Sequence, residues 1–166
     1  MADGAGSGAG PAGVGVTTLD LPLGVGTRAP GFTLSASDGR TVRLAEVLAT
    51  DRALLVFYPG NDTPGCDRQL SVLRDEFETY RRAGVRPFGV NPAAVAAHAD
   101  YAARLELPFP LLSDPDLAVA RAYQAVRPGI DRIDRTVYLI DRDGTVRFGA
   151  RGAPGAEITL EALGEA

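Results

Sequence analysis

The chain of 166 residues contains a single cysteine, Cys66, in a context that suits a nucleophilic thiol. Cys66 follows Thr63, Pro64 and Gly65, after the apolar run 53–58 and a turn of Pro, Gly, Asn and Asp. The run predicts a strand buried on both faces, Thr63 fits a helix N-cap, and Pro64 fits the first helical residue. Cys66 is therefore expected in the first turn of a helix at the carboxyl end of a strand. The unpaired N–H groups and the helix dipole at such a position stabilise a thiolate over a thiol.

The alternative is that Cys66 is a small buried hydrophobic residue, as most free cysteines are. A cysteine used only for packing belongs within an apolar run such as 53–58, whereas Cys66 follows Thr-Pro-Gly. We therefore interpret Cys66 as a reactive residue. With no second cysteine, the chain cannot form an internal disulfide, and the absence of a Cys-x-x-Cys pair excludes a thioredoxin-type disulfide exchanger.

Strand and helix patterns alternate along the chain around this motif. Apolar periodicity and turn residues predict a hairpin within 26–44, helix 44–48, strand 53–58, helix 66–83, strand 85–90, helix 93–105, a short strand within 107–115, helix 116–123, strands 135–141 and 146–150, and helix 157–163. This order predicts an α/β chain with a thioredoxin-like fold, in which helices flank a mixed central β-sheet and an N-terminal β-hairpin forms an extension.

Composition excludes several classes of function. A net charge of −4 without a basic cluster argues against nucleic-acid binding, and no apolar run approaches the ~20 residues that cross a bilayer. All 17 basic residues are arginine, which excludes Schiff-base chemistry by lysine. Residues 1–18 are rich in Gly and Ala without the cationic start of a signal peptide, so we expect a disordered tail before a domain at 19–166. A single cysteine favours the reducing cytoplasm.

The motif Pro59-x-x-x-Thr63-x-x-Cys66 resembles the active-site motif of the peroxiredoxins. Its Thr-Pro-Gly-Cys form is most similar to the bacterioferritin-comigratory-protein or peroxiredoxin Q branch, with the alkyl hydroperoxide reductase E branch as a neighbour. The resemblance spans roughly residues 24–163 and includes the Ala-Pro-x-Phe-x-Leu segment at 29–34. It implies a thiol-dependent peroxidase without a cofactor, which reduces hydrogen peroxide or organic hydroperoxides.

The chemistry requires a thiolate, donors for the peroxide oxygens and stabilisation of the leaving oxygen. We expect Cys66 to be the nucleophile, the Thr63 hydroxyl to cap the helix and reach the thiolate or peroxide, and the backbone N–H groups of Gly65 and Cys66 to face the same space. The resemblance implies that Pro59 shields the thiolate from water. Its other role is simply to end the strand.

The resemblance also assigns a cation, Arg135, to contact the cysteine and the peroxide. By periodicity alone Arg135 would be a surface charge, and Arg132 or Arg127 could compete for the role. Gln69 occupies a position where relatives usually carry Glu, so it can accept a hydrogen bond from an arginine but supplies no negative charge.

Two further features bear on the reaction. Ser71 occupies the position at which many relatives of this branch place a resolving cysteine, so an external thiol, either a small molecule or a thioredoxin-like protein, must reduce the sulfenic acid on Cys66. His98, the only histidine, is interpreted as an ordinary helix residue, and no pattern of metal ligands accompanies it.

A homodimer is compatible with the resemblance. The competing hypotheses are a redox relay that passes the oxidation of Cys66 to a partner protein, and a non-enzymatic holdase.

Overall fold

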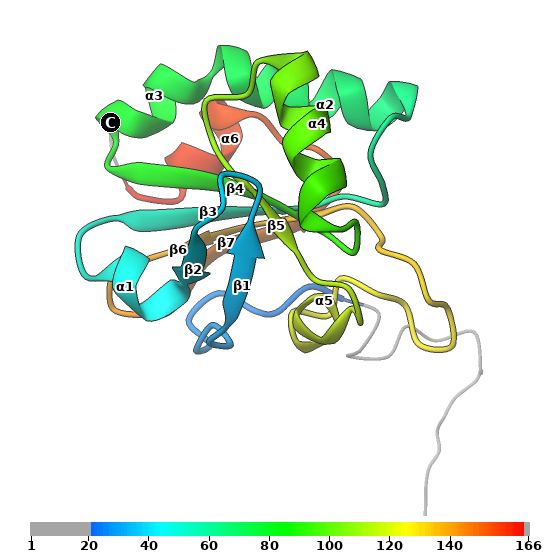
Figure 1. Ribbon diagram of the computed structural model, residues 1–166. Coiled ribbons are helices and arrows are strands. Elements are labelled where there is room, and N and C mark those ends of the chain that lie inside the picture. Colours follow the sequence, from blue (N-terminus) through cyan, green and yellow to red (C-terminus); the bar gives the residue numbers. More distant parts are fainter. Residues whose placement is uncertain (1–20, 165–166) are drawn as a thin grey trace, which may run out of the picture.

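The computed structural model describes residues 21–164, and the predicted tail at 1–18 lies outside them (Figure 1). The described residues form a seven-stranded sheet in the order β2-β1-β5-β4-β3-β6-β7. β3 and β4 pair in parallel, as do β4 and β5, while the other neighbours are antiparallel. The strands are β1 (Thr33–Ala36), β2 (Thr41–Arg43), β3 (Arg52–Phe57), β4 (Val85–Asn91), β5 (Leu111–Ser113), β6 (Thr136–Ile140) and β7 (Val146–Arg151). The predicted mixed sheet is therefore confirmed.

Helices cover both faces of this sheet (Figure 1). Helices α2, α3, α4 and α6 pack on one face, and α1 and α5 pack on the other. Their bounds are α1 (Leu44–Leu48), α2 (Pro64–Asp75), α3 (Phe77–Arg82), α4 (Val95–Leu105), α5 (Ala118–Ala122) and α6 (Ala156–Glu161). None of the helices in the described part of the chain is long and apolar enough to cross a membrane.

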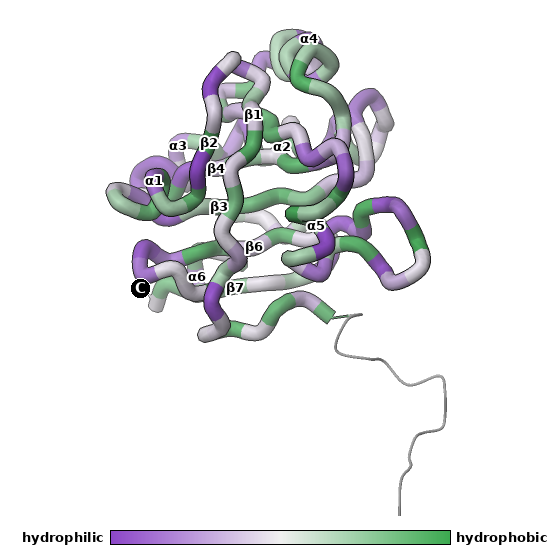
Figure 2. Tube along the Cα trace, turned by 60° about the horizontal axis from the view of Figure 1, so that its bottom comes forward, coloured by the Kyte–Doolittle hydropathy of each residue, from purple (hydrophilic) through white to green (hydrophobic). Residues whose placement is uncertain are grey.

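Strand β3 lies in the interior of the sheet and leads directly into the Cys66 motif. Leu55 and Phe57 belong to the core cluster under α1 and α5, whereas Leu54 and Val56 belong to the cluster under α2, α3 and α4. Because successive side chains of a strand point to opposite faces, a strand covered on both faces is apolar throughout. Figure 2 shows this as hydrophobic colouring along β3. The strand predicted at 53–58 is confirmed.

The N-terminal hairpin is also confirmed, with strands β1 and β2 on either side of the Asp-Gly turn. Gly39 adopts φ +86°, a conformation that side chains disfavour, so it allows the tight turn. Strand β1 pairs with β5, and this pairing joins the hairpin to the edge of the main sheet.

The helix predicted at 66–83 is wrong in its continuity, because the structure divides it into α2 and α3 at Glu76. Glu76 adopts φ −96° and ψ 5°, outside helical geometry. Its carboxylate accepts a hydrogen bond from the backbone N–H of Ala156, at the first residue of α6. This long-range contact accompanies a break that helical periodicity does not reveal.

Candidate active site

Cys66 lies in the first turn of α2, where the sequence predicts it. Thr63 is the N-cap, with extended backbone, and Pro64 is the first helical residue. The Thr63 hydroxyl oxygen accepts a hydrogen bond from the backbone N–H of Cys66 at 3.3 Å, so the predicted capping role is confirmed. Cys66 is fully buried, at 0% exposure, within the cluster that includes Tyr58 and Tyr101.

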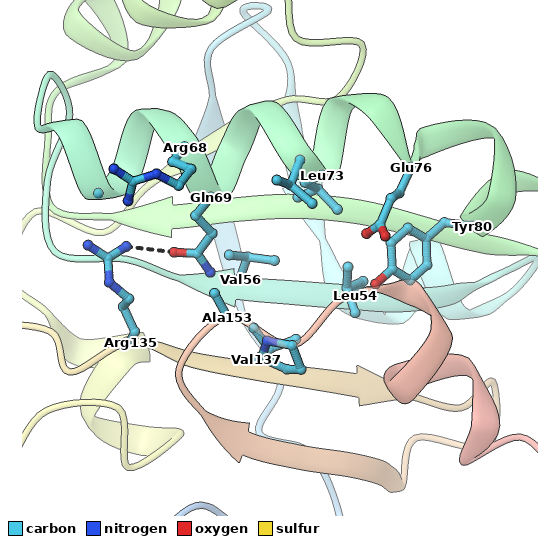
Figure 3. Close-up of a pocket in the computed structure, with 13 residues that line it drawn as sticks. Leu54, Val56, Arg68, Gln69, Leu73, Glu76, Tyr80, Arg135, Val137 and Ala153 are labelled. Atoms are coloured by element: carbon cyan, nitrogen blue, oxygen red, sulfur yellow. Dashed lines mark hydrogen bonds between the residues drawn. The ribbon is translucent and has the colours of Figure 1, made fainter.

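Arg135, directly before β6, lies against this turn. Its Nη1 donates a hydrogen bond to Oε1 of Gln69 at 2.7 Å (Figure 3). A Cβ atom on Gly65 would lie only 2.8 Å from Nη2 of Arg135, closer than real Cβ contacts come. A glycine immediately before Cys66 therefore makes room for the guanidinium beside the cysteine turn.

Arg127 and Arg132, the two alternatives to Arg135, lie in different surroundings from Arg135. Arg127 is exposed and forms an ion pair with Asp134 at 2.9 Å. Arg132 is also exposed. Both line a hollow of about 500 Å³ that also includes Pro59 and Arg135. Of the three arginines, Arg135 is the one whose guanidinium contacts the α2 turn.

A second hollow, of about 420 Å³, starts beside this turn and extends under α2 (Figure 3). Polar groups from Arg68, Gln69 and Arg135 lie at the end near Cys66, and Glu76 and Tyr80 lie at the other end. Its remaining walls are largely apolar, formed by Leu54, Val56, Val72, Leu73, Val137, Ala153 and Pro154. Cys66 itself does not line it, because the thiol is covered.

On the other side of the turn lies a polar network centred on Asn61, which is half-buried. Asn61 Oδ1 accepts hydrogen bonds from the Tyr58 hydroxyl at 2.8 Å and from Asn91 Nδ2 at 3.2 Å. Asn61 Nδ2 lies 3.2 Å from Nδ1 of His98, and His98 Nε2 lies 3.0 Å from the carbonyl oxygen of Leu112. Since a carbonyl only accepts, Nε2 carries the proton and Nδ1 accepts from Asn61. His98 is thus a neutral, fully buried ring on α4.

This ring predicts a dependence of stability on pH. Burial lowers the pKa of His98 below its ordinary value. As the pH falls below ~6.5, the unfolded chain therefore takes up a proton that the folded protein does not, and the free energy of unfolding decreases. Urea titrations at about pH 7.5 and about pH 5.5 should show a larger decrease for the native protein than for His98→Gln. An equal decrease in both proteins would contradict a neutral, buried His98.

Sequence reasoning did not single out Asn61, Asp67 or Tyr101, and it treated His98 as an ordinary helix residue. The Tyr101 hydroxyl donates a hydrogen bond to the carboxylate of Asp67, the residue after Cys66. His98 and Tyr101 are three residues apart, so they share one face of α4. This spacing was a usable signal, but only the tertiary structure shows that the shared face meets the Cys66 turn.

Comparison with known proteins identifies the family. Residues 25–148 match the AhpC/TSA family. The chain is 34% identical to a putative peroxiredoxin bcp of Coxiella burnetii over 135 residues, which cover 76% of this chain and 87% of that protein. It is also 34% identical to the chloroplastic peroxiredoxin Q of Triticum aestivum over 124 residues, covering 74% of this chain but only 57% of the wheat protein.

Solved structures agree with these relatives. The crystal structure of peroxidoxin BcpB from Mycobacterium tuberculosis matches with a TM-score of 0.77 and 26% identity, covering 84% of this chain and 95% of that one. A mutant PrxQ of Xylella fastidiosa matches in fold with a TM-score of 0.78 at 22% identity, covering 86% of this chain and 98% of that one. The predicted thioredoxin-like fold is confirmed by this likeness. The chain belongs to the AhpC/TSA family, as a peroxiredoxin of the bacterioferritin-comigratory-protein and peroxiredoxin Q type.

Proposed function

We propose that this protein is a thiol-dependent peroxidase of the one-cysteine form, with Cys66 as its nucleophile. The observation that carries the proposal is the position of Cys66 in the first turn of α2, directly after Gly65, against which the guanidinium of Arg135 lies. The Cys66 thiolate attacks one oxygen of a hydroperoxide, an S–O bond forms and the O–O bond breaks. The other oxygen leaves as hydroxide or alkoxide and takes up the proton that the Cys66 thiol released on ionising, which gives water or an alcohol, and Cys66 becomes a sulfenic acid.

The surrounding groups have separate roles in this step. Arg135 binds the peroxide and stabilises the negative charge on the leaving oxygen, while Gln69 orients the guanidinium. The Thr63 hydroxyl and the N–H groups of Gly65 and Cys66 hold the peroxide beside the sulfur, and the N–H of Cys66 exchanges its hydrogen bond to the Thr63 oxygen for one to the peroxide. Pro59 limits the access of water to the thiolate.

The one-cysteine form determines how the cycle closes. Since Cys66 is the only cysteine, an external thiol must attack the sulfenic sulfur, which forms a mixed disulfide and releases water. A second thiol then attacks this mixed disulfide, regenerates the Cys66 thiol and leaves as an external disulfide. The reductant is a small thiol or a thioredoxin-like protein.

The substrate is hydrogen peroxide or an organic hydroperoxide. The hollow of about 420 Å³ beside Arg135 supports the second class, because its largely apolar walls suit a hydrocarbon group.

The cytoplasmic location and a role in cell redox homeostasis remain predictions. The homodimer is also a prediction, which analytical ultracentrifugation of the full chain would test.

The close approach of Arg135 to Gly65 leads to a specific prediction. In Gly65→Ala the added methyl group displaces the guanidinium from the cysteine turn. We expect the rate of Cys66 oxidation to fall about fivefold or more, with little change in the free energy of unfolding because the arginine side chain can move. Rapid-quench oxidation and urea unfolding measure the two quantities. Gly60→Ala is a matched control, because a Cβ atom there meets open space; an equal loss of rate in both variants would contradict the explanation.

Steady-state turnover tests the function as a whole. The protein is mixed with hydrogen peroxide or cumene hydroperoxide, and with either excess dithiothreitol or a coupled thioredoxin system, and peroxide loss is recorded. Sustained turnover with one of these reductants supports the peroxidase. A single oxidation without turnover, together with a specific partner protein trapped on Cys66 as a mixed disulfide, would favour the relay instead.

A further inference from the structure

Helix α4 directs three side chains at the segment that holds Cys66. They are His98, Tyr101 and Arg104, spaced by three residues, and they contact Asn61, Asp67 and Asp62 respectively. All three contacted residues lie within seven positions of one another in the loop and first turn around Cys66. Because side chains at this spacing lie on one face of a helix, α4 supports the reactive turn along much of its length.

The contact through Asn61 belongs to the largest hydrogen-bond network of the three. Asn61 forms hydrogen bonds with three residues, which are Tyr58 three positions earlier, Asn91 at the end of β4 and His98 on α4. Asn91 is fixed in turn, since its Oδ1 accepts the backbone N–H of Ala93. Oδ1 of Asn61 accepts from Nδ2 of Asn91, and Nδ2 of Asn61 donates to Nδ1 of His98. A flipped amide would lose both hydrogen bonds, so the amide of Asn61 has one favourable orientation. The loop before Cys66 is therefore held by hydrogen bonds from Asn61 to three other residues.

The second contact is to Asp67, the residue directly after Cys66. The Tyr101 hydroxyl donates to Oδ1 of Asp67, and Tyr101 is fully buried. Burial first, then the Asp67 carboxylate and Cys66, raise the pKa of Tyr101, so this phenol remains a proton donor. Arg104 adds an ion pair to Asp62 at 2.7 Å, and Asp62 adopts a φ of 62°, which is disfavoured for an aspartate. We assign less weight to this pair because both side chains are exposed.

Because Cys66 is buried, these contacts bear on how peroxide and external thiols reach its sulfur. At 0% exposure the thiol is closed even to a water-sized molecule, so each half-reaction needs some opening at Cys66. Hydrogen peroxide is small and needs only a local opening while the turn stays against Arg135, whereas a bulkier reducing thiol needs the turn itself to move. The two half-reactions therefore depend in opposite ways on how firmly the turn is held.

Resting on the proposed function, we propose that His98 and Tyr101 are positioning residues that hold the Cys66 turn in its oxidation-competent form and so limit its reduction by external thiols. They act through Asn61 and Asp67 and do not contact the peroxide. Weakening either contact slows the oxidation of Cys66 and speeds the reduction of its sulfenic acid.

Tyr101→Phe tests this with the smallest change, since it removes one hydroxyl and keeps the buried ring. We expect the second-order rate of Cys66 oxidation by hydrogen peroxide to fall about fivefold and the rate of sulfenic acid reduction by dithiothreitol to rise by a similar factor. Both rates are measured by rapid quench and intact mass, the second after oxidation with one equivalent of peroxide. His98→Phe, which should change both rates in the same directions, is the second variant.

Tyr123→Phe is the matched control. It also removes a buried hydroxyl, one that donates to the carbonyl oxygen of Pro30 at 2.6 Å, in the core cluster on the opposite face of the sheet. The control should leave both rates unchanged. The proposal is overturned if Tyr101→Phe leaves both rates unchanged, lowers both or raises both.

Hydrogen exchange separates this proposal from the proposed function. Amide exchange at residues 64–69 should be faster in Tyr101→Phe than in the native protein, while exchange in α6 should not change. This result would show that Tyr101 on α4 stabilises the Cys66 turn, whether or not Cys66 reacts with peroxide. If native Cys66 did not react, only the proposed function would fail. Unchanged exchange at 64–69 would overturn the positioning role even in an active peroxidase.

Discussion

Replacing Arg135 by alanine should lower the rate of Cys66 oxidation by hydrogen peroxide by more than about tenfold, which corresponds to at least ~1.4 kcal/mol of the barrier. The physical reason is the loss of the cation that lies against the cysteine turn, bonded to Gln69. Without this cation the peroxide and its leaving oxygen lose the charged partner that Gln69 orients. Rapid-quench oxidation under single-turnover conditions measures the effect directly, independently of the reductant.

Two controls show whether this effect belongs to Arg135 and to its geometry. Arg127→Ala removes an exposed arginine from the same side of the site, where it pairs with Asp134, and should change the rate less than about twofold. Arg135→Lys keeps the positive charge but loses the planar fork, and should recover only part of the rate. A loss in Arg127→Ala as large as that in Arg135→Ala would contradict the assigned role.

Replacing Cys66 by serine should abolish peroxide consumption, to the level of a protein-free control. Serine is close in size to cysteine and its hydroxyl remains protonated at neutral pH, so the variant lacks a nucleophile. The measurement is peroxide loss in the presence of excess thiol, with circular dichroism to verify the fold. Ser71→Ala, at the position where a resolving cysteine would lie, is the control and should remain active.

Two outcomes of this experiment would contradict the account. Residual peroxidase activity in Cys66→Ser would mean that the chain holds a different reactive group. Prevention of protein aggregation that survives in Cys66→Ser, in a protein without thiol-dependent turnover, would support the holdase hypothesis.

The sequence predicted those parts of the fold that depend on local signals. Thr63 and Pro64 predict the start of α2 because capping and the fixed φ of proline act within one turn. Strand β3 could be predicted because a strand buried on both faces has to be apolar throughout. The break at Glu76 could not be predicted, because the carboxylate bonds a residue 80 positions further along the chain.

The site shows the same division. Cys66 and Gln69 are neighbours on one helix, so their relation follows from spacing alone. The choice of Arg135 over Arg127 and Arg132 followed from the family resemblance, since a charged residue before a strand carries no periodic signal. The room left for its guanidinium by Gly65 is visible only in the folded chain. The role of α4 was missed for the same reason, because the Asn61–His98 contact joins residues 37 positions apart.

The most direct test of the central claim is the rate at which reduced native protein reacts with a slight excess of hydrogen peroxide. Samples are quenched rapidly, free thiols are alkylated, and the intact mass is recorded at each time. The account predicts rapid gain of one oxygen at Cys66, far faster than a free cysteine reacts at the same pH. A rate no faster than that of free cysteine would contradict a peroxidatic site at Cys66.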